Sequence, residues 1–232
     1  MMRMMIMISH VLDILVIINN KIILNMVDNF DLIGENLRFY NEKSFYFIQI
    51  IKRKKENPEL TGYSRPIESF YVFSREQFDR FKPHIIEKCE QNKARAYIKM
   101  NTLDAEKVGL MAIRVLSEEI GNRDWKSLSS NFNVACGQSG AQAETKKLYL
   151  IDIDNDLGYD RKEVKEYISK LHPLTEDGQP IDKIVMEVPT RNGYHFLATG
   201  FEMNKFKQDY PNIDVHKDGI TLLYFPNSCD LK

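Results

Sequence analysis

The sequence contains few cysteines, and none of them form a metal-binding pair. Cys89, Cys136 and Cys229 lie far apart among the 232 residues, and no CxxC motif occurs. A zinc site built from cysteine is therefore not expected. An odd number of cysteines without a secretory pattern is typical of reduced thiols in a cytosolic protein, where they usually act as small buried hydrophobes. We therefore expect a cytoplasmic protein.

The sequence also lacks internal repeats, low-complexity segments and an excess of charge of either sign. Lys and Arg total 32 against 33 for Asp and Glu, which argues against a uniformly basic nucleic-acid binder but allows a local basic groove. Apolar residues make up 43% of the chain and charged residues 28%, as in soluble globular proteins. The length suffices for one large domain or two small ones.

Residues 1–27 are rich in Met, Ile, Leu and Val but contain no long apolar run. Arg3, Asp13 and the polar stretch 19–21 interrupt the segment. A membrane-spanning helix needs about 20 nearly uninterrupted apolar residues, and a signal peptide would require a small-residue cleavage site. We interpret residues 1–27 as a leader of doubtful significance. An additional packed helix is the main alternative, and a membrane anchor is the least favoured.

Alternation and helical spacing predict strands and helices in the first half of the chain. Residues 45–51 and 69–73 are aromatic and β-branched and predict strands, as does the alternating segment 94–100. Ser74 is a predicted helix N-cap, and a second long helix is expected from about 103 to 120. The charged segment between the first two strands, residues 52–58, is expected to be a solvated turn rather than a phosphate contact.

The C-terminal third carries the clearest pattern. It predicts strands at 147–154, 181–188 and 194–198, a helix at 161–171, and a hairpin of strands 213–217 and 220–225 around Asp218-Gly219. These elements indicate an α+β fold with an antiparallel-rich sheet covered by helices on one face. We divide the chain into an N-terminal α/β part, 28–145, and a catalytic part, 146–232.

Two carboxylates stand at the end of the apolar strand that closes with Asp152-Ile153-Asp154. Residues two apart on a strand point to the same face, so the two carboxylates repel each other unless a cation lies between them. Carboxylate oxygens are the ligands that Mg²⁺ and Mn²⁺ prefer. The simpler alternative to a metal site is that one Asp caps the following helix and the other is solvated. A calcium loop ending at Glu163 is another, but Leu157 stands where that loop needs Gly, and a strand precedes it.

A polar turn, Thr190-Arg191-Asn192-Gly193, leads into a strand that carries His195. Such a turn offers backbone N–H groups to phosphate oxygens, and Arg191 could add a charge-assisted contact. His195 alternates away from its apolar neighbours, so we expect it on the same face as the carboxylates.

Asp214 is our candidate for a third metal-binding carboxylate. Asp218 shares its alternating face and competes with it. Because Asp218 precedes Gly219 in the predicted hairpin turn, forming that turn is the simpler role for Asp218.

Taken together, these motifs resemble the archaeo-eukaryotic primase superfamily, which includes the primase-polymerases of phages and mobile elements. The family signature is an apolar strand ending in Asp-x-Asp, then a small-x-His strand, then an apolar-Asp strand. The matching segments here are 150–154, 193–195 and Ile213-Asp214. Two positions depart from the pattern: many members have Ser where this chain has Gly193, and many carry Pro-Gly-Ser where this chain has Pro226-Asn227-Ser228.

The resemblance implies an RRM-like catalytic core and template-directed nucleotidyl transfer by two metal ions, Mg²⁺ or Mn²⁺, held by Asp152, Asp154 and Asp214. It also implies that His195 holds the incoming triphosphate. The expected partners are a single-stranded DNA template, nucleoside triphosphates and a separate replicative helicase. Two alternatives remain open: a replication-initiator or nucleic-acid-binding accessory module with little catalysis, and a calcium-binding interaction protein.

Overall fold

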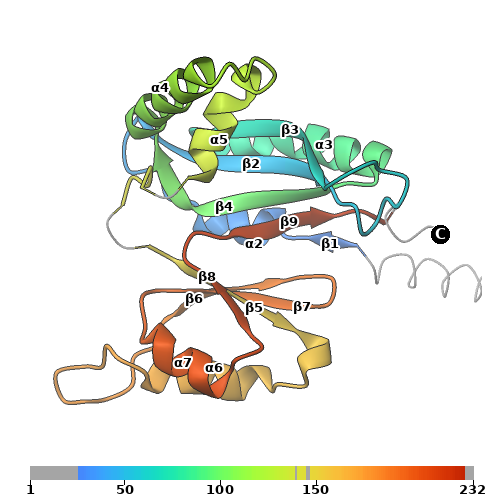
Figure 1. Ribbon diagram of the computed structural model, residues 1–232. Coiled ribbons are helices and arrows are strands. Elements are labelled where there is room, and N and C mark those ends of the chain that lie inside the picture. Colours follow the sequence, from blue (N-terminus) through green and yellow to red (C-terminus); the bar gives the residue numbers. More distant parts are fainter. Residues whose placement is uncertain (1–25, 139, 145–146, 228–232) are drawn as a thin grey trace, which may run out of the picture.

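The computed structural model describes residues 26–138, 140–144 and 147–227 (Figure 1). Most of the predicted leader, residues 1–25, lies outside this range, and its last residue, Val27, begins a strand. In chain order the elements are β1 (Val27–Asp28), α2 (Phe30–Asn36), β2 (Ser44–Lys52), β3 (Arg65–Val72), α3 (Arg75–Asn92), β4 (Arg95–Asp104), α4 (Ala105–Gly121), η1 (Leu128–Ser130), α5 (Asn131–Gly137), β5 (Tyr149–Asp154), η2 (Asn155–Leu157), α6 (Arg161–Lys170), β6 (Ile184–Pro189), β7 (Gly193–Ala198), α7 (Met203–Asp209), β8 (Asp214–His216) and β9 (Ile220–Phe225).

The strands form two antiparallel sheets, which Figure 1 shows one above the other. The first sheet has the order β1-β9-β4-β2-β3 and the second the order β6-β7-β5-β8. This arrangement confirms the predicted α+β class with antiparallel sheets. The helix cover differs from the prediction, because the first sheet has helices on both of its faces.

The two-sided cover of the first sheet follows from strand β2, whose residues are apolar on both faces. Tyr46 and Ile48 pack with α2 and α3, whereas Phe45 and Phe47 pack with α4 and α5. A strand buried on both sides has a nearly continuous apolar sequence rather than a polar–apolar alternation. The run that predicted a strand at 45–51 therefore also places that strand in the interior.

Helix α3 begins where the sequence predicted. The Ser74 hydroxyl accepts a hydrogen bond from the Gln77 backbone N–H (3.2 Å), and the Gln77 side chain accepts one from the Phe73 N–H (2.8 Å). These two bonds satisfy N–H groups that a helix start would leave unpaired. Pro83, which could have split this helix, lies inside one continuous element.

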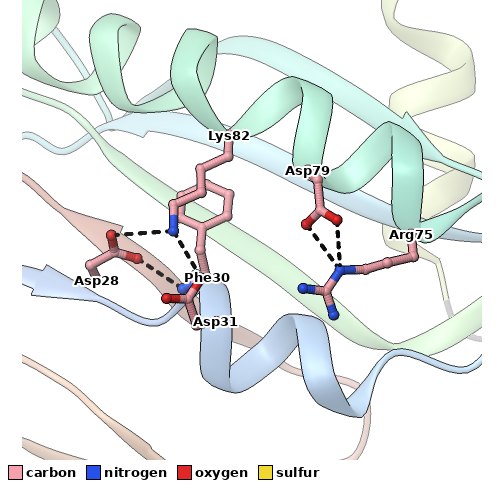
Figure 2. Close-up of polar contacts among 6 residues, drawn as sticks. All are labelled: Asp28, Phe30, Asp31, Arg75, Asp79 and Lys82. Carbon is pink, nitrogen blue, oxygen red and sulfur yellow. Dashed lines mark hydrogen bonds and ion pairs between the residues drawn. The ribbon is translucent and has the colours of Figure 1, made fainter.

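Helix α2 was not predicted, because seven residues are too few to show a clear period. Figure 2 shows how it docks on α3. The Phe30 N–H donates to the Asp28 carboxylate (2.9 Å), and Lys82 of α3 places its Nζ 2.9 Å from Asp31 and 3.8 Å from Asp28. Phe30 and Ile33 are fully buried, so α2 contributes apolar surface to the core beneath the first sheet.

The second sheet separates an apolar face from a face that carries the site. Ile151 and Phe196 pack with α6 and α7. Asp152 and His195 alternate to the opposite face, where their neighbours Leu150 and Leu197 join the core shared with the first sheet. This shared core holds the two sheets together.

The predicted hairpin of strands 213–217 and 220–225 is wrong. Strand β8 pairs with β5 in the second sheet, and β9 lies between β1 and β4 in the first sheet. Residues 217–219 therefore carry the chain from one sheet to the other. The physical reason lies in β9 itself, whose last five residues are all buried and so require neighbours on both sides. The predicted boundary at residue 146 therefore does not coincide with the boundary between the sheets, because β9 comes after that residue and belongs to the first sheet.

Candidate active site

A cleft of about 580 Å³ lies between the two sheets. The second sheet and its turn contribute Asp152, Asp154, Thr190, Arg191, Asn192 and His195 to its lining. The first sheet contributes Arg53, Lys55, Ser64, Arg95 and Tyr97. The wall from the second sheet thus carries the carboxylates Asp152 and Asp154, and the wall from the first sheet carries the cations Arg53, Lys55 and Arg95. This arrangement is suited to a ligand that carries both a metal ion and phosphates.

Asp152 occupies the centre of the acidic wall, on the middle strand β5. It lies directly opposite His195 on β7 and opposite Asp214 on β8. The Asp152 Oδ1 and the His195 Nε2 are 3.4 Å apart. Burial alone would raise the pKa of the Asp152 carboxyl, but hydrogen bonding to His195, with the charges of His195, His216 and Arg53, lowers it below its ordinary value. Asp152 therefore stays ionised at neutral pH.

Asp154 shares the face of Asp152 but has a different environment. Partial burial, followed by the charges of Asp152 and Asp156, raises the pKa of the Asp154 carboxyl above its ordinary value, although Lys55 acts in the opposite direction. Its side chain does not cap the short helix η2 that follows. Asp154 is thus an exposed carboxylate at a position where negative charge is already in excess, and a bound cation would relieve that excess.

His195 is held from two sides. Its ring is only 8% exposed, and its Nδ1 lies 2.9 Å from the hydroxyl oxygen of Thr221 on β9. Since Thr221 belongs to the first sheet, the imidazole links the two sheets and its orientation is fixed. The other ring nitrogen, Nε2, faces Asp152 at the cleft wall. The predicted placement of His195 on the face of the carboxylates agrees with this geometry.

The turn before His195 is pinned to the end of β5. The Thr190 N–H donates to the Gly193 carbonyl (2.9 Å), and the Asn155 N–H donates to the Asn192 carbonyl (2.7 Å). At Gly193 the backbones come so close that a Cβ would lie 1.9 Å from the Ile153 carbonyl oxygen. Only glycine fits such an approach, which accounts for Gly193 at this position.

Arg191 extends from this turn toward strand β9. Its guanidinium lies 5.1 Å from the centre of the Phe225 ring, and Arg95 lies 4.5 Å from that ring. The two cations are therefore positioned by the same aromatic side chain, within reach of a cation–π contact. Both guanidinium groups line the cleft, and that of Arg95 is already paired with the Glu56 carboxylate (2.5 Å).

Asp214, the predicted third carboxylate, is adjacent to Asp152 in register but does not join the cleft. Its side chain is 77% exposed and lies 3.9 Å from Lys207. Within residues 26–138, 140–144 and 147–227, no three acidic, His or Cys side chains are grouped closely enough to hold a metal ion. A three-carboxylate cluster is thus not assembled among the residues that the structure describes.

Asp218 has a structural role quite unlike the hairpin turn that the sequence predicted. It lines the cleft, and its carboxylate lies 2.7 Å from the Nζ of the buried Lys99. It also accepts hydrogen bonds from Asn101 (3.0 Å) and Gln142 (2.6 Å). These contacts fasten the connection between the two sheets to strand β4.

The cationic wall was not predicted as part of the site. Residues 52–58 were expected to form a solvated turn, yet Arg53 and Lys55 line the cleft and Arg95 joins them from β4. Their positive charge was visible in the sequence, but no local signal relates residues 53 and 95 to residue 152. Only the packing of the two sheets brings them together.

The calcium-loop alternative finds little support in this region. Asp160 is the N-cap of α6 and accepts hydrogen bonds from the N–H groups of Lys162 (2.7 Å) and Glu163 (3.0 Å). The element before the acidic segment is strand β5, where a calcium-binding helix–loop–helix needs a helix. Capping, rather than metal binding, accounts for Asp160.

The cysteines and helices add two further observations. Cys89 and Cys136 are buried, as expected, and burial raises the pKa of the Cys136 thiol to about 12; Cys229 lies outside the described residues. Among the helices of the described residues, none has the length and apolar character needed to cross a membrane.

No protein-family model matches the chain, and comparison with curated proteins and with solved structures gave no match. A function must therefore be inferred from the side chains of the cleft.

Proposed function

We propose that the protein is a metal-dependent, template-directed nucleotidyltransferase of the primase or primase-polymerase type, with its active site in the cleft. One observation carries the proposal: Asp152, Asp154 and His195 gather on one wall, opposite Arg53, Lys55 and Arg95. A nucleoside triphosphate with a divalent cation has the matching charge distribution. The order of the three motifs along the chain, which resembles that of the primase superfamily, agrees with this proposal. We include in this proposal an RRM-like catalytic core, formed by the second sheet.

The acidic wall fits a divalent cation. Its donors are carboxylate oxygens, and the raised pKa of Asp154, caused by partial burial and then by Asp152, marks a point where added positive charge is favourable. Magnesium is commonly bound by one or two carboxylates together with substrate phosphates. Asp152 and Asp154 would hold such an ion, which would supply Lewis-acid activation and charge neutralisation when bound. Asp214 would join them only after its exposed side chain turns toward Asp152.

The chain's own residues would position the triphosphate. His195, oriented by Thr221, places its Nε2 at the cleft wall 3.4 Å from Asp152, and this nitrogen would donate to a phosphate oxygen in place of that contact. Thr190 and Asn192 line the cleft beside it, and Arg191 adds positive charge. Arg53 and Lys55, on the opposite wall, would contact phosphates of the nucleotide or of a single-stranded DNA template. A separate helicase would supply that single strand.

A non-catalytic nucleic-acid-binding module is the second candidate, and a specific observation favours it. The side chain of Asp214 is 77% exposed and does not line the cleft, so the third carboxylate of a two-metal site is not in place. Such a module would use the cationic wall for binding and would synthesise little.

A synthesis assay separates the two candidates. Purified protein is incubated with single-stranded template, labelled nucleotides and Mg²⁺ or Mn²⁺, with and without primer. The proposal expects labelled product that disappears in Asp152→Ala and Asp154→Ala and persists in the control Asp177→Ala, an exposed Asp in the loop after α6. Equal product from all four proteins would reject the site, and template binding without product would favour the accessory module.

A further inference from the structure

The connection between β2 and β3, residues 53–64 (the β2–β3 loop), is a folded element at the mouth of the cleft. Asn57 is 1% exposed, and its side chain donates hydrogen bonds to the carbonyls of Arg53 and Lys93, each at 3.0 Å. Leu60 is also buried, and the Ser64 hydroxyl accepts a hydrogen bond from the Lys54 N–H (3.0 Å). These contacts fix the backbone of the loop.

Tyr63 projects from this ordered loop into solvent. Tyr63 is 93% exposed, more than any other large apolar side chain among the described residues. Gly62, with φ of +91°, makes the turn immediately before it, a backbone conformation that other residues rarely adopt. The turn thus presents an aromatic ring to solvent beside Ser64, which itself lines the cleft.

The loop also carries a surplus of positive charge on the side of the cleft. Its two acidic residues are already paired, Glu56 with Arg95 and Glu59 with Lys52. Lys55 is exposed and lines the cleft, and Arg65 is exposed next to the loop's end. An exposed aromatic ring on a loop with exposed cations is the combination that sequence-tolerant proteins use to hold unpaired bases and their phosphates.

We propose that the β2–β3 loop binds single-stranded nucleic acid at the mouth of the cleft, with the Tyr63 ring stacked on a base and Lys55 and Arg65 contacting phosphates. An unpaired strand is favoured over a duplex because stacking on Tyr63 requires a base whose face is free. Lys55 lies both in the loop and in the cleft lining, so a strand held by the loop continues toward Asp154. This inference rests on the proposed function for the identity of the cleft as the reaction site.

Binding is measured by fluorescence anisotropy with a labelled oligothymidine strand, in metal-free buffer at several salt concentrations. Tyr63→Ala should weaken binding about tenfold or more, as expected for the loss of one base–aromatic stack, while Tyr63→Phe should bind like the wild type. Lys55→Ala should weaken binding and reduce the slope of log K against log salt by about 0.7, the value for one phosphate of a single strand.

Trp125→Ala and Lys126→Ala are the matched controls. Both residues are exposed, and they follow α4, which Figure 1 shows at the opposite end of the molecule from the second sheet. Neither control should change the affinity. Wild-type affinity in both Tyr63→Ala and Lys55→Ala would overturn the inference, as would an equal loss in the controls, or Tyr63-dependent binding to phosphatidylserine vesicles without binding to the oligonucleotide.

The metal-free binding measurement separates this inference from the proposed function. Tyr63-dependent binding by a protein that synthesises nothing with any metal would support the loop and refute the enzyme. Robust synthesis together with unchanged binding in Tyr63→Ala and Lys55→Ala would support the enzyme and refute the loop.

Discussion

Replacing Asp218 by Asn should destabilise the protein strongly, although the change removes one charge and almost no volume. The side chains of Lys99 and Asp218 are only 2% and 12% exposed, and their charged atoms are 2.7 Å apart. Asn at 218 can still accept a hydrogen bond, but it leaves the Lys99 ammonium buried beside neutral acceptors, such as the Cys136 carbonyl (2.9 Å), in place of a carboxylate. An uncompensated buried charge is expensive.

The expected cost follows from this burial. Removing one partner of a buried ion pair destabilises a protein by about 3–5 kcal/mol, and the retained amide should keep this change near the lower value. For a domain of this size each kcal/mol lowers Tm by about 2–4 °C. Asp218→Asn should therefore lose about 3 kcal/mol in the free energy of unfolding and melt roughly 6–12 °C below the wild type.

Guanidinium unfolding followed by far-UV circular dichroism measures this loss. Asp214→Asn is the matched control, because the same chemical change at a 77% exposed side chain should alter the free energy of unfolding by less than about 0.5 kcal/mol. The double variant Lys99→Met, Asp218→Asn should recover much of the loss, since the buried ammonium is then absent. If Asp218→Asn unfolds like the wild type, residue 218 is an ordinary turn position and the assigned role of the Lys99 pair is wrong.

Four further predictions concern Gly193, Asp152, residues 1–25 and Asp214. Gly193→Ala should cost about 2–4 kcal/mol in thermal unfolding and abolish synthesis, because the added Cβ meets the Ile153 carbonyl at 1.9 Å; unchanged melting would contradict this close approach. Burial raises the pKa of the Asp152 carboxyl, but His195 outweighs this effect and lowers the folded pKa below the ordinary value of about 4. The resulting stability is present above the ordinary pKa and is lost as the pH falls through the lower folded value. Melting curves of the wild type should show this loss between about pH 5 and pH 2, and Asp152→Asn should lack that contribution. Deleting residues 1–25 should leave a soluble, active protein, and insolubility together with membrane fractionation of the full chain would refute it. Asp214→Asn should reduce metal-dependent turnover by several orders of magnitude at little cost in stability, because the proposed site uses this carboxylate as its third metal ligand; full activity would remove it from the metal site.

The parts of the fold that could be predicted from the sequence are those set by local chemistry. The apolar run at 45–51 specifies a strand because its side chains have no polar face, and Ser74 with Gln77 specifies a helix start through two local hydrogen bonds. Alternation likewise placed Asp152 and His195 on one face. Each of these signals lies within a few residues of the feature that it predicts.

The remaining features depend on contacts between distant segments. The Asp218-Gly219 turn signal indicates a reversal but cannot tell which sheet the next strand joins, and here β9 enters the first sheet. The partner that gives Asp218 its role, Lys99, is more than a hundred residues away in the chain. The cationic wall was missed for the same reason, because Arg53 and Asp152 meet only through the packing of the two sheets.

A Mn²⁺ titration tests the central claim most directly. Electron paramagnetic resonance would follow free Mn²⁺ with and without a non-hydrolysable nucleoside triphosphate, in the wild type, in the double variant Asp152→Asn, Asp154→Asn, and in Asp160→Asn, where Asn can still cap α6. We predict that the triphosphate tightens Mn²⁺ binding in the wild type and in Asp160→Asn, and that the double variant loses this binding. Undiminished binding by the double variant, or nucleotide-independent Ca²⁺ binding that Asp160→Asn abolishes, would contradict it.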